Sequence, residues 1–153
     1  MGNVNTDNVL SCCDYRKMTE IWLAASLEAH AFIPGAFWEN NADEMRSVYL
    51  PRAENYAYVD DGTVTGFISL RDCHVEALFV MPSHQNRGVG RMLLDKAKSL
   101  CARLTLAVYS ENRSAVDFYM HNGFTVVEER TDHLTGHPEK IMMWTARERK
   151  CSE

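Results

Sequence analysis

The segment from Glu76 to Leu100 constrains the fold more than any other part of this sequence, because it runs an apolar strand through a glycine turn into a helix. The turn, QNRGVG, places Gly88 and Gly90 where the helix begins. The first N–H groups of a helix have no intrahelical acceptor, and the helix dipole adds partial positive charge there. The turn is therefore predicted to hold a phosphate or diphosphate, with a plain strand-to-helix turn as the alternative.

Two common phosphate-binding motifs do not fit this spacing. The dinucleotide motif GxGxxG needs a third glycine where Leu93 stands and an acidic residue about 20 positions after the turn, and Asp95 comes too early. A Walker loop needs lysine and then serine or threonine after the second glycine, and here Arg91 and Met92 follow. Binding of a dinucleotide or a nucleoside triphosphate by those routes is excluded.

Hydrophobic spacing and turn residues divide the chain into helices and strands. Asp14 is a cap candidate for the first helix, the pair Asp61 and Gly62 predicts a hairpin turn, and Gly123 ends the last helix. The pattern predicts an α/β (α+β) fold around a central, partly antiparallel sheet, in a single domain spanning residues 1–153. Helices are expected at about 14–30, 38–49, 90–102 and 112–122, and strands at about 9–12, 56–59, 64–70, 75–80, 104–109, 124–129 and 141–145.

Composition and charge narrow the class of protein. The chain has 153 residues, of which 46% are apolar and 24% charged, as is typical of one globular domain. A formal net charge of −5 argues against nucleic acid as a partner. No apolar run approaches the roughly 20 residues that span a bilayer, and the amino terminus is polar, so no membrane partner and a cytoplasmic location are expected. The five cysteines form no CxxC pair, so reduced thiols and no metal site are expected.

A second motif, NRSAVDFYMHNGF, lies on the helix expected at 112–122 and continues to Phe124. Together with QNRGVG it resembles the NxxAxxFYxxxGF and Q/RxxGxG/A motifs of the GNAT superfamily of N-acetyltransferases. The resemblance implies a GNAT-like fold, with a mixed, mostly antiparallel sheet of six to seven strands and about four flanking helices. It also implies transfer of the acetyl group of acetyl-CoA to an amine by direct attack in a ternary complex. A non-catalytic acyl-CoA-binding sensor or regulatory module is the alternative.

The resemblance further implies roles for individual residues. Tyr119 would donate a proton to the departing thiolate, and Asn112 would hydrogen-bond the pantetheine arm or an ordered water. Taken alone, Asn112 also fits a helix N-cap, and one residue can do both. Backbone groups near the end of the preceding strand would contact the pantetheine amides, and the turn would hold the diphosphate. The residues concerned are Phe79, Val80 and Met81 on the strand, and Gln85, Asn86, Arg87, Gly88, Val89, Gly90 and Arg91 in the turn.

The attacking amine must lose a proton before it reacts. A lysine-like amine with a pKa near 10.4 is deprotonated at neutral pH at a cost of about 4.6 kcal/mol. Glu76 and His74 lie two positions apart on one face of the strand before the turn, where the resemblance implies a base that works directly or through a water. Glu76 is slightly preferred to His74 as the base, and the alternative for Glu76 is a carboxylate in a surface salt bridge.

The acceptor is expected to be an amine on a small molecule or a peptide. The resemblance places its site between the early helices and the late hairpin, where His30, Phe32 and Trp38 are candidate contacts. Both a monomer and a homodimer are compatible with the sequence.

Overall fold

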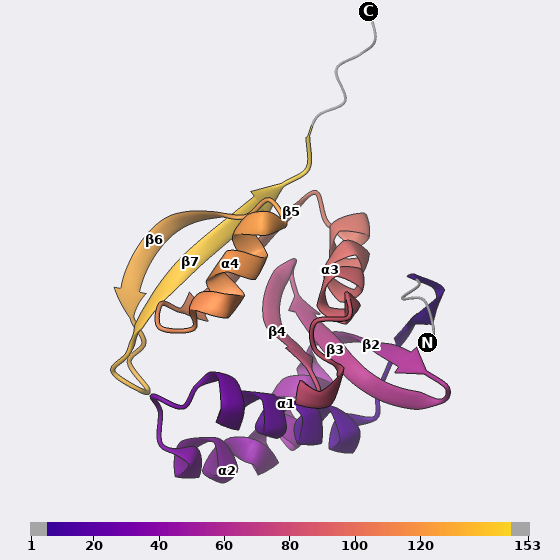
Figure 1. Cartoon of the computed structure of the whole chain (residues 1–153), viewed down its shortest axis with the longest axis horizontal. Coiled ribbons are helices and arrows are strands. Elements are labelled where there is room, and N and C mark those ends of the chain that lie inside the picture. The colour runs from indigo at the N-terminus through magenta and orange to yellow at the C-terminus, as the bar shows by residue number, and fades with distance from the viewer. Residues whose placement is uncertain (1–5, 148–153) are drawn as a thin grey trace, which may run out of the picture.

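The computed structural model describes residues 6–147, which build one seven-stranded sheet covered by helices (Figure 1). The strand order is β1-β2-β3-β4-β5-β7-β6, and β4 and β5 are parallel while all other neighbours are antiparallel. This confirms the expected mixed, mostly antiparallel sheet. The strands are β1 (Val9–Ser11), β2 (Glu54–Asp60), β3 (Thr63–Arg71), β4 (His74–Val80), β5 (Arg103–Tyr109), β6 (Thr125–Thr131) and β7 (Pro138–Thr145).

Four α-helices pack on the sheet and form two core clusters with it. Phe67 packs in the cluster with α1 and α2, whereas its neighbour Ile68 packs in the cluster with α3 and α4. Successive strand residues point to opposite faces, so the two helix pairs cover different faces of the sheet. No helix within residues 6–147 has the length and apolar character needed to cross a membrane. The helices are α1 (Tyr15–Ala29), α2 (Gly35–Glu44), α3 (Val89–Leu100) and α4 (Arg113–His121), with short helical segments at Thr6–Asn8, Met45–Tyr49, Leu50–Arg52 and Pro82–His84.

Local sequence signals account for several ends of these elements. Asp14 caps α1, because its side chain accepts a hydrogen bond from the N–H of Lys17 at 3.1 Å. Asp61 and Gly62 have φ angles of 51° and 76°, which a two-residue hairpin between β2 and β3 requires. The second helix begins at Gly35, earlier than expected, because the preceding proline supplies its N-cap position.

The parallel strands β4 and β5 separate soon after they begin. They pair through His74 with Thr105 and Val75 with Leu106, and the described strands show no pairing between them beyond these positions. Over the rest of their lengths, β4 stays paired with β3 and β5 with β7. The separated halves of β4 and β5 therefore leave an opening in the sheet. The separated part of β4 lines both cavities described below, and that of β5 lines one of them.

The cysteines differ from the sequence prediction. Cys73 and Cys101 form a disulfide, with their Cα atoms 5.9 Å apart, so the expectation of reduced thiols is wrong for this pair. Cys73 lies in the turn before β4 and Cys101 directly follows α3, and spacing along the chain does not report that these two segments meet. Cys12 and Cys13 are free thiols, and Cys151 lies outside the described residues.

Candidate active site

The glycine turn leads into a helix start without a side-chain cap. Gly88 is the N-cap of α3 with a φ of 84°, and Asn86 just before it has a φ of 64°. Glycine adopts such left-handed angles at the lowest cost. A Cβ at Gly90 would lie 3.4 Å from Cζ of Phe118 and 3.9 Å from Cγ2 of Val80, so a longer side chain would press against these two side chains. The first N–H groups of α3 are thus accessible to an anion.

The polar side chains of the turn are partly engaged within the protein. Gln85 donates a hydrogen bond from Nε2 to the carbonyl oxygen of Val80 at 3.0 Å, which ties the turn to the end of β4. Nε of Arg91 lies 3.9 Å from Oδ2 of Asp95 in an exposed pair, and such pairs contribute little energy. The turn therefore offers mainly backbone N–H groups, with the guanidinium of Arg91 as a nearby cation.

A cavity of about 440 Å³ lies over this helix start, and we call it the glycine-turn cavity. Most of the residues predicted to bind acetyl-CoA line it. Met81 does not, because its N–H donates to the carbonyl oxygen of Thr65 at 2.8 Å and its side chain packs with α1 and α2. Arg87 is exposed and also lies outside the lining. The predicted residues that do line the cavity are Phe79, Val80, Gln85, Asn86, Gly88, Val89, Gly90, Arg91 and Asn112.

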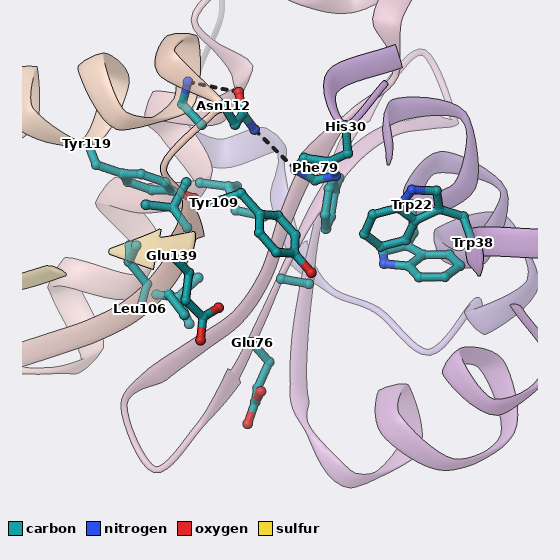
Figure 2. A pocket seen from close by; sticks show the side chains of 16 residues that line it. Trp22, His30, Trp38, Glu76, Phe79, Leu106, Tyr109, Asn112, Tyr119 and Glu139 are labelled. Carbon is teal, nitrogen blue, oxygen red and sulfur yellow. Dashed lines mark hydrogen bonds between the residues drawn. The ribbon is translucent and has the colours of Figure 1, made fainter. Parts of the chain in front are cut away.

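A second cavity, of about 260 Å³, lies between α1, α2, β4 and β5, and we call it the aromatic cavity (Figure 2). Trp38 stacks on His30 with ring centroids 5.1 Å apart, and Tyr109 meets His30 edge-on at 5.2 Å. Glu76 and Glu139 are its acidic residues, and no lysine or arginine is among the described residues that line it. Aromatic faces and carboxylates together favour a cationic ligand.

Five residues line both cavities and mark the place where the cavities meet: Leu78, Phe79, Asn112, Ala115 and Tyr119. Tyr119 is 8% exposed, and burial raises the pKa of its phenol well above the usual range. Tyr119 therefore carries its proton at neutral pH, and the raised pKa makes it a weaker acid than an exposed tyrosine.

Asn112 connects α4 to the end of α1. Its Oδ1 accepts a hydrogen bond from the N–H of Ala115 at 3.3 Å, and its Nδ2 lies 3.2 Å from Nε2 of His30. Asn112 is therefore the N-cap of α4 and also a wall of both cavities, so the two alternatives from the sequence are compatible. His30 is 7% exposed, and burial lowers its pKa from 6.5 to about 4, so its ring is neutral at neutral pH.

The two candidate bases have different surroundings. Glu76 lines the aromatic cavity, whereas His74 lines neither cavity and has Nδ1 2.7 Å from Oγ1 of Thr105, at the paired end of β4 and β5. Glu139 on β7 is a further carboxylate of the aromatic cavity that sequence reasoning did not single out. Its Oε1 accepts a hydrogen bond from Nε of Arg130 at 2.8 Å. Glu76 is thus the candidate base that the fold brings to a cavity.

Phe32 lies beside the aromatic cavity, where it contacts the rings of His30, Tyr109 and His137 at centroid distances of 5.8, 5.7 and 5.2 Å. Tyr109, which lines the cavity, is a residue that sequence reasoning missed. Its O–H donates to Oδ2 of Asp132 at 2.6 Å, so the loop before β7 is tied to the ring cluster. No local pattern marks Tyr109, because its partners are remote in the chain.

Comparison with known proteins identifies the family. A family model described as an acetyltransferase (GNAT) domain matches residues 24–136, which is most of the chain. The chain belongs to the GNAT family of acetyltransferases. The family, the fold and the enzyme class predicted from the two motifs are therefore confirmed.

Several relatives of this GNAT chain match along most of their length. Peptidyl-lysine N-acetyltransferase YiaC of Escherichia coli K12 is 32% identical over 126 residues, covering 82% of this chain and 86% of that protein. Peptidyl-lysine N-acetyltransferase YjaB of Salmonella typhimurium is 34% identical over 127 residues, covering 82% and 87%. The solution structure of apo YjaB from Escherichia coli has a TM-score of 0.80 at 28% identity, covering 91% of this chain and 97% of that one.

Proposed function

We propose that this GNAT protein transfers the acetyl group of acetyl-CoA to the side-chain amine of a lysine in a peptide or protein, by direct attack in a ternary complex. The observation that supports this most is that two cavities of different character meet at Asn112 and Tyr119. One offers backbone N–H groups to an anion, and the other offers rings and carboxylates to a cation. The lysine acceptor is supported by the similarity to YiaC and YjaB, which are named as peptidyl-lysine N-acetyltransferases.

The residues around the glycine turn fit the diphosphate of CoA. Gly88 and Gly90 carry no side chain at the start of α3, and the residues that line the glycine-turn cavity run from there to Tyr119. When bound, acetyl-CoA supplies an activated acetyl thioester. In this proposal the N–H groups at the helix start bind the diphosphate, and Phe79 and Val80 on β4 contact the pantetheine arm.

Three groups of this chain act on protons and charge in the proposed reaction. Glu76 accepts the proton that the lysine amine loses, directly or through a water, with His74 as the second candidate. Tyr119 donates its phenolic proton at the sulfur that departs. A backbone N–H of the segment from Leu78 to Val80 stabilises the negative charge that develops on the acetyl oxygen.

Replacement of Tyr119 by phenylalanine tests the proposal, because the ring stays and only the proton donor is removed. We expect Tyr119→Phe to lower kcat by roughly 100-fold, the lower range for a general acid, while the Kd for acetyl-CoA stays within about threefold. Release of the CoA thiol with a lysine peptide gives kcat, and calorimetry gives Kd. Tyr56→Phe is the matched control, since Tyr56 lines neither cavity.

The same experiment separates the proposal from a non-catalytic acyl-CoA sensor. A sensor would bind acetyl-CoA but release no thiol with any member of a broad amine panel. An unchanged kcat in Tyr119→Phe would remove Tyr119 from the mechanism and leave transfer itself intact.

A further inference from the structure

The orientation of the Asn112 side chain is determined by two contacts (Figure 2). Its Oδ1 accepts from the N–H of Ala115 as the cap of α4, so this end of the amide is the carbonyl end. The other end, Nδ2, therefore faces Nε2 of His30 at 3.2 Å. An amide nitrogen is only a donor, so Nε2 of His30 must be the acceptor.

This assignment determines the tautomer of His30. A histidine that accepts through Nε2 is neutral and carries its single proton on Nδ1. The burial of His30 and its lowered pKa agree with a neutral ring. The Nδ1–H group is buried and has no hydrogen-bond acceptor among the described residues.

Trp38 presents a second donor of the same kind. It is 6% exposed, its Nε1 is buried without a partner among the described residues, and its ring stacks on His30. Both residues line the aromatic cavity. Buried donors are nearly always paired in folded proteins, so two unpaired donors in one cavity lining are available to an acceptor oxygen that enters the cavity.

We propose that Nδ1–H of His30 and Nε1–H of Trp38 bind a carbonyl oxygen of the acceptor, and so select an amine that belongs to a peptide. The charge of the aromatic cavity favours a neutral carbonyl over a carboxylate. Glu76 lines the same cavity and would repel the free carboxylate of an amino acid, whereas a neutral peptide carbonyl meets no such penalty. Glu139 also lines it, but its charge is paired with that of Arg130. This inference rests on the proposed transfer to lysine and assigns the residues that recognise the peptide part.

The test compares three acceptors of similar reach: Nα-acetyl-lysine amide, free lysine, and pentylamine, which has no carbonyl. With the native protein we expect kcat/KM for Nα-acetyl-lysine amide to exceed that for pentylamine by roughly tenfold or more, the usual effect of leaving buried donors unpaired. Free lysine should also rank below the amide, because a carboxylate beside an α-ammonium group stands where the amide has a neutral carbonyl.

Two variants each remove one of these donors. His30→Met removes the Nδ1–H group and introduces no N–H donor, and its thioether sulfur can still accept weakly from Asn112. Trp38→Phe keeps an aromatic ring and removes only the Nε1–H. In both, the ratio of kcat/KM between amide and pentylamine should fall toward one. His121→Gln, on the exposed end of α4, is the control and should keep the native ratio.

A measurement without turnover uses protein labelled with 15N in histidine. The His30 ring should carry its proton on Nδ1, and the resonance of that proton should move when Nα-acetyl-Nε-acetyl-lysine amide is added. A proton on Nε2 instead would overturn the inference, whether or not the variants fold.

The outcomes also separate this inference from the proposed function. Equal kcat/KM for the amide and pentylamine, or a preference that persists in both variants, would overturn the recognition of a carbonyl while leaving acetyl transfer in place. Absence of transfer to any of the three amines, with acetyl-CoA still bound, would overturn both.

Discussion

The glycine-turn cavity and the aromatic cavity differ in what their walls are made of. The former takes seven of its seventeen lining residues from one short stretch, His84 to Arg91, where the main chemical groups are backbone amides. The latter is built from side chains between Trp22 and Glu139, contributed by three helices and three strands. Ligand binding in the glycine-turn cavity should therefore depend mainly on access to backbone N–H groups. Binding in the aromatic cavity should depend mainly on which side chains are present.

The largest effect should come from obstructing the glycine turn. Gly88→Val forces valine into a left-handed φ that it disfavours, and Gly90→Val places methyl groups against Phe118 and Val80. We expect both changes to keep a diphosphate from the N–H groups of the helix start. Loss of two charge-assisted hydrogen bonds should weaken acetyl-CoA binding on the order of 1000-fold, or about 4 kcal/mol. Calorimetric titration measures the loss.

Gly136→Val is the matched control for that change. Gly136 has a φ of 77° and open space around it, so it has the same backbone cost as position 88 without facing a cavity. Micromolar binding retained in the variants at Gly88 and Gly90 would show that the turn does not bind the diphosphate.

The difference between the two cavities also explains what could be predicted from the sequence. QNRGVG could be identified because its groups are contiguous and follow from one strand, one turn and one helix start. The strands and helices were predictable for the same reason, since their signals are local periodicities. His30 was only a candidate contact, because its partner Asn112 lies 82 residues away.

Other contacts had no local signal at all. Tyr109 appears in the sequence as the last apolar residue of a strand, and its hydrogen bond to Asp132 depends on how β5 and β7 pair. The disulfide between Cys73 and Cys101 depends in the same way on where α3 ends relative to β4. Such pairs follow from the packing of remote segments, which no single window of sequence contains.

The next effect concerns the stability of the fold that holds both cavities. The disulfide joins the turn before β4 to the end of α3, next to the short paired region of β4 and β5. Closing a loop with a sequence separation of 28 should stabilise the fold by about 3.5 kcal/mol. Replacing Cys73 and Cys101 together by serine should lower the free energy of unfolding in urea by about that amount.

The free thiols provide the comparison for this prediction. Serine at Cys12 and Cys13, which form no disulfide, should change the urea midpoint far less. If a reducing agent leaves the midpoint of the native protein unaltered, the bond does not contribute as described.

A pH effect should be specific to the aromatic cavity. The pKa of His30 is lowered by burial from 6.5 to about 4, so the unfolded chain binds a proton at pH values where the folded chain does not. Its contribution to stability is therefore complete above about pH 6.5 and declines as the pH falls toward 4, by about 3 kcal/mol at pH 4.

The contribution of His30 is isolated by subtraction, because carboxylates also titrate in this range. The difference in unfolding free energy between the native protein and His30→Gln should shrink by about 3 kcal/mol between pH 7 and pH 4. The same difference for the exposed His121→Gln should change much less. Parallel pH curves for the native protein and His30→Gln would contradict a buried neutral ring.

The smallest effect is expected at Asn112, one of the residues where the two cavities meet. Its side chain both caps α4 and contacts His30, and two variants can separate these functions. Asn112→Ala removes the N-cap of α4 and should cost about 1 kcal/mol of stability, whereas Asn112→Asp keeps a capping oxygen for Ala115. Both variants remove the Nδ2 donor to His30. If positioning of His30 affects the acceptor side alone, both should lower kcat/KM for a lysine peptide by roughly tenfold and change the Kd for acetyl-CoA by less than about threefold. A kcat/KM that falls only in the alanine variant would mean that Asn112 acts through the stability of α4 and not through His30.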